Sequence, residues 1–89
     1  MTPIEKARNL GPVCAAEFAT IGIHSLEQIV ELGWEEVMVR WVQAYPERAN
    51  LNAATALIGA IEDVDWRKVR PSDKAAARQL ISELKLRRL

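Results

Sequence analysis

The sequence contains a single cysteine, Cys14, a single histidine, His24, and no excess of charge of either sign. One cysteine cannot form an intramolecular disulfide, and its solitary use is typical of proteins in reducing compartments. One cysteine and one histidine also fall short of the three or four ligands that a metal site needs. The 12 basic residues balance the 12 acidic residues, and this neutrality argues against a strong non-specific binder of nucleic acid.

Long apolar runs are also missing. The longest uninterrupted stretches are far too short to span a bilayer, and residues 1–6 show no basic region followed by an apolar run. We therefore expect a soluble cytoplasmic protein that does not bind membranes. The 89 residues suffice for one domain, residues 1–89, and an apolar content of 49% can fill a small core.

Glycine and proline divide the chain into short segments with helical periodicity, and no strand pattern is present. Gly11 and Gly22 lie where tight turns need conformational freedom, and Pro12 suits the first turn of a helix because it lacks an N–H group. Side-chain N-caps are expected at Thr2, Ser25 and Asn50. The expected helices are a short one that begins at Pro3 and ends by Asn9–Leu10, then 13–21, 26–32, 34–45, 51–62 and 71–86.

The apolar residues of these segments recur at helical spacing and predict the core. Small residues are concentrated in 51–62, which indicates a central helix that its neighbours approach closely. Trp66 lies in a connector and is expected to fill the bottom of the core. The other predicted core residues are Cys14, Phe18, Ile21, Leu26, Ile29, Val30, Trp34, Val37 or Met38, Trp41, Tyr45, Ala77, Leu80, Ile81 and Leu84.

The fold class that follows is all-α, a compact bundle of five to six short helices with a helix-hairpin-helix or SAM-like arrangement. Five motifs in order extend over residues 7–84, and together they resemble the C-terminal domain of the TfoX/Sxy family of bacterial competence regulators. They are Asn9-Leu10-Gly11-Pro12, Gly22-Ile23-His24-Ser25-Leu26-Glu27-Gln28-Ile29, Asn50-Leu51-Asn52, Ala56-Leu57-Ile58-Gly59-Ala60 and Asp65-Trp66-Arg67. The resemblance implies a non-catalytic regulatory or interaction module and a helical fold.

The chain departs from the family pattern within the fourth motif and just before it. Ala54-Thr55 replaces a usual Leu-Tyr, and Ile58 replaces a usual glutamate. An isoleucine in place of a carboxylate suggests exposed apolar surface. We therefore predict a face for a protein partner or for self-association that includes Val39, Ile58 and Leu89.

The Gly11-Pro12 hairpin is a candidate for phosphate contact, as in helix-hairpin-helix proteins, where backbone N–H groups of the turn face a DNA phosphate. Asn9 occupies the position of the first hairpin glycine and Pro12 removes a donor, so a purely structural turn is the alternative. The candidate contacts are Lys6, Arg8, Gly11, Val13 and Cys14.

No residues form a catalytic constellation, so we expect no enzyme activity, no cofactor and no small-molecule substrate. Carboxylates at 35–36 and 62–65 lack polar partners in the sequence and are interpreted as solvated. Basic residues gather at 67–70 and at 78–88, either as ordinary surface charges or as a phosphate track that continues the hairpin. The leading hypothesis is protein–protein association, and the alternative is weak DNA binding through the hairpin without sequence preference.

Overall fold

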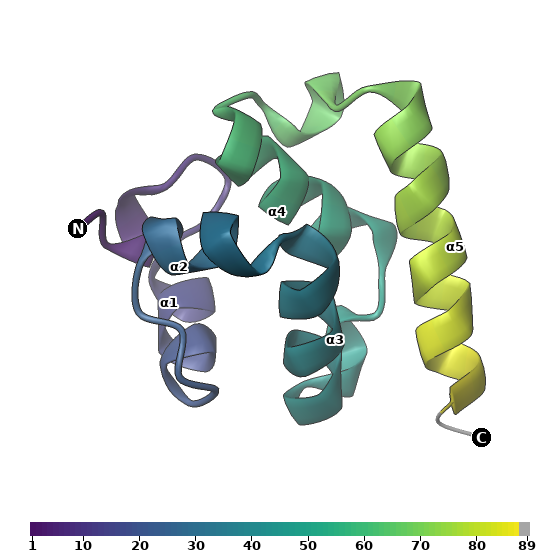
Figure 1. Ribbon diagram of the computed structural model, residues 1–89, viewed down its shortest axis with the longest axis horizontal. Coiled ribbons are helices and arrows are strands. Elements are labelled where there is room, and N and C mark those ends of the chain that lie inside the picture. The colour runs from purple at the N-terminus through teal and green to yellow at the C-terminus, as the bar shows by residue number, and fades with distance from the viewer. Residues whose placement is uncertain (88–89) are drawn as a thin grey trace.

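The computed structural model describes residues 1–87 and is all-α in that part of the chain, which confirms the predicted fold class. Within residues 1–87 there are five α-helices and three 3-10 turns (Figure 1). The α-helices are α1 (Pro12–Ala19), α2 (Leu26–Leu32), α3 (Trp34–Ala44), α4 (Leu51–Glu62) and α5 (Pro71–Arg87). The 3-10 turns are η1 (Ile4–Lys6) before α1, η2 (Pro46–Arg48) between α3 and α4, and η3 (Trp66–Lys68) between α4 and α5.

Two predicted N-caps are confirmed. The Ser25 hydroxyl accepts a hydrogen bond from the Gln28 N–H at 3.2 Å, and the Asn50 side chain accepts one from the Ala53 N–H at 2.8 Å. Gly33 separates α2 from α3 with a φ of 86°, a conformation that a side chain would strain. These local signals set the helix boundaries within one or two residues of the prediction.

The predicted N-terminal helix is wrong, because only the single turn η1 forms there and no side chain caps it. Thr2 makes a different contact. Its backbone N–H and its hydroxyl donate to the two carboxylate oxygens of Glu27 in α2, at 2.7 and 2.8 Å. Pro3 forms an isolated bridge with Ser25, so the chain start is extended alongside the beginning of α2.

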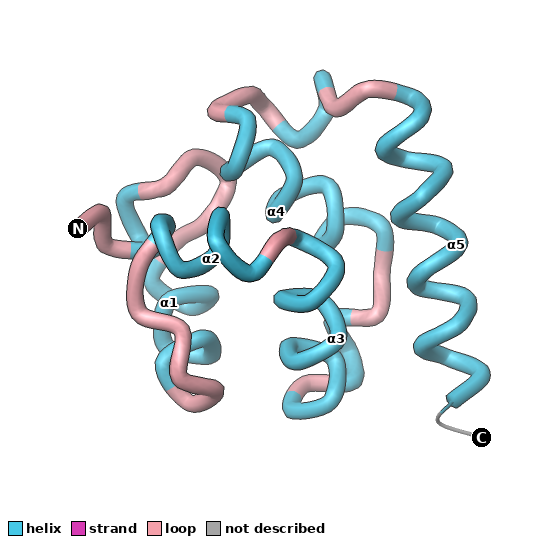
Figure 2. The backbone as a smooth tube through the Cα atoms, viewed as in Figure 1, coloured by secondary structure: helices cyan, strands magenta, loops and turns pink. Residues whose placement is uncertain are grey.

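Helix α4 is the central helix, as its small residues predict. It packs against α2, α3, α5 and η3, and most of its residues are buried. Figure 1 shows α1 and α2 to one side of it and α5 along the opposite edge, joined to α4 by the stretch that holds η3. Figure 2 shows the longer loop stretches on the side of the N-terminus and between α4 and α5, and only a short segment between α2 and α3.

The core is built around Trp41 and Phe18, whose ring centroids lie 4.5 Å apart at an interplanar angle of 51°. Both side chains are buried, as the helical periodicity predicts. Two predictions of burial are wrong. Val30 is 52% exposed on α2, and Trp66 is 41% exposed on η3. Within residues 1–87, no helix combines the length and apolarity needed to cross a bilayer.

Candidate functional site

The side chain of Asn9 fastens the hairpin before α1 to the connector after α4. Its amide nitrogen donates to the backbone oxygen of Val64 at 2.9 Å, and its carbonyl oxygen accepts from the backbone N–H of Trp66 at 3.2 Å. Asn9 itself has a φ of 70°, in the left-handed region that glycine and asparagine tolerate best. Asn9 occupies the position of the first hairpin glycine and keeps a backbone conformation that glycine favours. Its side chain adds two hydrogen bonds to the backbone of Val64 and Trp66, which we call the Asn9 clasp.

The side chain of Asn9 and the backbone of Val64 and Trp66 pack directly against Gly59 in α4. A Cβ atom at Gly59 would lie 2.6 Å from the Val64 oxygen and would collide with the Asn9 amide nitrogen. It would also lie 3.5 Å from the Cα atom of Trp66. Three of the five sequence motifs, those that contain Asn9, Gly59 and Trp66, therefore meet at one point, which we call the Asn9 junction.

The backbone of Trp66 belongs to the Asn9 junction, whereas its side chain is exposed. Its backbone is fixed by the bond to Asn9, and the guanidinium of Arg67 lies 6.0 Å from the centre of its ring. The carboxylate of Asp65 holds that guanidinium with two hydrogen bonds, of 3.0 and 3.1 Å. These bonds from Arg67 lower the pKa of Asp65 to about 2. Asp65, which is half-buried, and the exposed Trp66 and Arg67 are together called the Trp66 surface here.

Ion pairs flank the Trp66 surface on the neighbouring elements. Arg8 donates to Asp63 at 3.1 Å, and Arg70 donates to Glu62 at 2.8 Å and to Asp73 at 3.4 Å. Each arginine of this region thus has a carboxylate partner within the chain. Lys68, the last residue of η3, is exposed and takes part in none of the ion pairs of residues 1–87, so the indole ring lies among three paired arginines and one lysine.

The model of the TfoX C-terminal domain matches residues 1–80. The chain belongs to this family. A crystal structure of an uncharacterized protein from Listeria monocytogenes has the same fold, with a TM-score of 0.85 over 92% of each chain at 18% sequence identity. A search of curated proteins found no match. The resemblance inferred from the five motifs is therefore confirmed, and in this TfoX C-terminal domain three of those motifs build the Asn9 junction.

The predicted phosphate contacts lie near one another at the hairpin of this TfoX C-terminal domain, but they do not converge. Lys6 is exposed on η1, whereas the side chain of Arg8 turns to Asp63. Gly11 precedes α1 in an extended conformation, with a φ of −140°. Val13 is 65% exposed and Cys14 is half-buried as a free thiol. The first turn of α1 carries no acidic residue, so its backbone N–H groups face no carboxylate from their own helix.

Of the three residues predicted to form a partner face, Ile58 is not at the surface. Ile58 is only 3% exposed, because it lies in the central helix α4, where its neighbours enclose it. The interpretation of this departure from the family pattern as exposed apolar surface is therefore wrong. Val39 is half-buried on α3. Leu89 lies outside the described residues.

Glu17 and Arg48 form a contact that the sequence analysis did not anticipate. The Glu17 carboxylate accepts two hydrogen bonds from Arg48, at 2.8 and 2.7 Å, and one from the indole N–H of Trp41, at 2.8 Å. The Arg48 guanidinium also lies 5.1 Å from the centre of the Trp41 ring. The hydrogen bonds from Arg48 are the main cause that lowers the pKa of Glu17, against an opposing effect of burial. This network joins α1, α3 and η2, so its role is structural.

In residues 1–87, no three residues among histidine, cysteine, aspartate and glutamate gather as they would around a metal ion. His24 is exposed, and its backbone N–H donates to the side chain of Gln28. His24 thus lies in the turn before α2, next to the N-cap Ser25. Among the exposed large apolar side chains of residues 1–87, Trp66 is the aromatic one, and its backbone is bonded to Asn9.

Proposed function

We propose that this TfoX C-terminal domain is a non-catalytic module that binds a protein partner in the cytoplasm through the Trp66 surface. The observation that carries the proposal is a tryptophan that is 41% exposed, although its backbone is fixed and its ring faces an arginine. Tryptophan and arginine are enriched among the residues that dominate binding energy at protein interfaces. A side chain that is already ordered loses little conformational freedom on binding, which favours affinity.

The charges around Trp66 favour a protein over a nucleic acid as the partner. A phosphate track needs cations that are free to replace counterions. Arg8, Arg67 and Arg70 instead each contact a carboxylate of this chain. Paired charges around an aromatic residue are typical of the polar rim of a protein interface.

Weak DNA binding through the hairpin has less support. The exposed amine of Lys6 and the first turn of α1 favour it, but Pro12 removes one donor and Arg8 is engaged by Asp63. Fluorescence anisotropy with labelled duplex and single-stranded DNA at low salt measures this directly. Binding that weakens log-linearly with salt and is lost in K6A/R8A would favour the hairpin over the Trp66 surface.

A pair of exposed-residue variants tests the proposal. Trp66→Ala removes the indole, and Leu86→Ala removes a side chain that is 69% exposed on α5 and lies outside the Trp66 surface. Tagged wild-type protein and both variants are expressed at equal levels in the native host, and co-purifying proteins are quantified by mass spectrometry after nuclease treatment. Unchanged circular dichroism shows that each variant is folded.

The proposal predicts at least one protein, a second copy of the chain included, that wild-type and L86A recover and that W66A loses by tenfold or more. Replacing a binding-energy hot spot by alanine costs about 2 kcal/mol or more, which corresponds to such a loss. Equal recovery by W66A and wild-type would contradict the proposal. So would a partner that disappears after nuclease treatment.

A further inference from the structure

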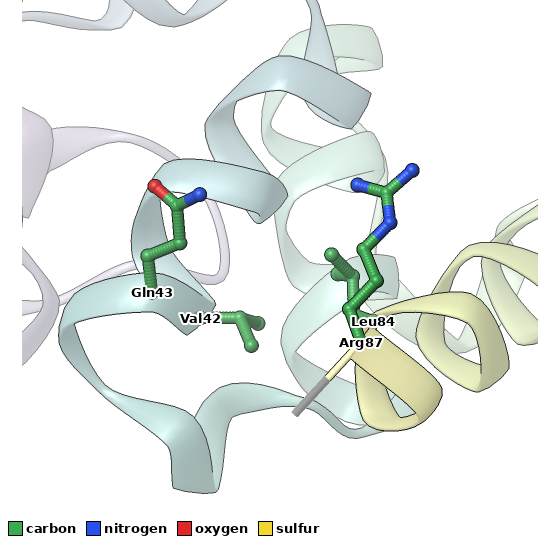
Figure 3. A pocket seen from close by; sticks show the side chains of 4 residues that line it. All are labelled: Val42, Gln43, Leu84 and Arg87. Atoms are coloured by element: carbon green, nitrogen blue, oxygen red, sulfur yellow. The ribbon is translucent and has the colours of Figure 1, made fainter. Parts of the chain in front are cut away.

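A pocket of about 280 Å³ lies between the C-terminal ends of α3 and α5 (Figure 3). It is lined by Val42 and Gln43 from α3 and by Leu84 and Arg87 from α5. Figure 1 places this region at the ends of the two helices, away from the stretch of chain between α4 and α5 that carries Trp66. The pocket is therefore separate from the Trp66 surface.

The floor of the pocket is apolar. Val42 and Leu84 are 2% and 4% exposed, and Figure 3 shows their side chains between those of the two polar residues. A volume of about 280 Å³ is at the low end for a small-molecule site, for which roughly 300–1,000 Å³ is usual. The floor is therefore suited to one aliphatic side chain.

The rim of the pocket supplies polar donors. Gln43 and Arg87 rise on opposite sides in Figure 3, and their amide and guanidinium groups project in the same general direction. The ion pairs of the described residues use five other arginines and leave out Arg87. The planar guanidinium of Arg87 matches the geometry of a carboxylate, and the amide of Gln43 offers a further donor from the other side of the pocket.

We propose that this pocket binds the C-terminal residue of a partner polypeptide that ends in an aliphatic amino acid. The aliphatic side chain lies on Val42 and Leu84, and the terminal carboxylate accepts hydrogen bonds from Gln43 and Arg87. A C-terminal residue carries its carboxylate on the same Cα atom as its side chain, so both groups fit a pocket of this size. Capture of a terminal carboxylate is an established mode of peptide recognition.

The electrostatics of the site favour this occupant on balance. The C-terminal ends of α3 and α5 each carry a partial negative charge of about half a unit, which disfavours an anion. Arg87 contributes a full positive charge at the rim. Lys85 of the same turn is two residues away and faces a different side of α5, and Glu83 lies one turn before Arg87 on the same side. The carboxylate therefore depends on Arg87, which makes this residue the decisive one to change.

The probes are three short peptides titrated into the ¹⁵N-labelled full chain and followed by NMR. The first is acetyl-Gly-Gly-Leu with a free carboxylate, the second is the same peptide as its C-terminal amide, and the third is acetyl-Gly-Leu-Glu-Gly-amide. The first peptide is expected to shift the side-chain amide of Gln43 and the backbone amides of Val42 and Leu84. It is expected to bind at least tenfold more tightly than the other two.

Arg87→Gln should remove the preference for the free carboxylate. Arg78→Gln is the matched control, because Arg78 also lies on α5, is exposed and takes part in none of the ion pairs of the described residues. The NMR spectrum of each variant shows directly whether it is folded. R78Q should retain the tenfold preference, and W66A should retain it as well, which separates this site from the proposed partner surface.

Equal binding of the acid and the amide would overturn the proposal, because the carboxylate would then contribute nothing. Equal binding of the peptide with an internal glutamate would overturn the choice of a chain terminus. An absence of shifts around the pocket at millimolar peptide would overturn the site itself. None of these results bears on the Trp66 surface.

Discussion

Replacing Gly59 by alanine should destabilise this domain, although the same change in an exposed helix is stabilising. The new Cβ atom would lie 2.6 Å from the backbone oxygen of Val64 and would collide with the amide nitrogen of Asn9. Both contacting groups are held in place, because they hydrogen-bond to each other at 2.9 Å. The methyl group therefore cannot enter without displacing the clasp that also holds the backbone of Trp66.

The expected cost follows from three contributions. Alanine is favoured over glycine in a helix by about 1 kcal/mol. Overpacking a tight contact costs about 1–3 kcal/mol, and losing the two hydrogen bonds of Asn9 costs about 0.5–1.5 kcal/mol each. The balance is a loss of about 1–5 kcal/mol, a large share of the roughly 5–15 kcal/mol by which domains are stable.

Urea unfolding followed by circular dichroism measures this loss as a lower midpoint at an unchanged slope. Asn9→Gly provides the matched background, since glycine tolerates the φ of 70° while lacking the amide. In that background, Gly59→Ala should cost at least about 1 kcal/mol less than it does in the wild-type, because one of the two clashing groups is gone. A Gly59→Ala protein that is more stable than the wild-type, or an equal cost in both backgrounds, would refute the reasoning.

Two further substitutions test contacts that hold the fold. Glu17→Gln should lower stability by about 1–3 kcal/mol at neutral pH, because it weakens the bonds from Arg48 and Trp41. Since the folded pKa of Glu17 lies below its ordinary value of 4.5, this stabilisation is present above that value and fades as the pH falls below it. The urea midpoints of E17Q and wild-type should therefore converge as the pH falls below about 4.5, and a difference that stays constant with pH would contradict the role of the charge. Ser25→Ala should lower the free energy of unfolding by about 1 kcal/mol, because it removes the cap on the Gln28 N–H, and Ser25→Gly should lower it by only about a few tenths of a kcal/mol. Equal thermal midpoints of S25A and wild-type would show that the cap contributes nothing.

The helices of this fold were predictable because their signals are local. Ser25 and Asn50 cap helices from within one turn, and Gly33 interrupts the chain where its φ of 86° excludes other residues. The small residues of α4 also correctly indicated a central helix. Each of these inferences needs only neighbours along the chain.

The errors arose where a distant residue decides the outcome. Thr2 caps no helix because Glu27, 25 residues away, accepts both of its hydrogen bonds. Trp66 is not a core residue because Asn9, 57 residues away, fixes its backbone at the surface. Ile58 is buried because it lies in the central helix α4, and the error came from interpreting its departure from the family pattern as exposed surface, although an isoleucine in a central helix favours burial. The candidate site depends on these long-range contacts, so the sequence supplied its residues but not their roles.

The central claim, that the Trp66 surface binds a protein, is tested most directly by photocrosslinking. A photoreactive phenylalanine analogue replaces Lys68, which is exposed in η3 beside Trp66, in one variant and the exposed Leu86 in another, so that Trp66 itself is kept. Irradiation of cells that express each variant at native level is followed by separation of nuclease-treated products by mass. The account predicts a discrete protein adduct from position 68 and none of the same mass from position 86. Identical products from both positions, or no protein adduct from position 68, would contradict it.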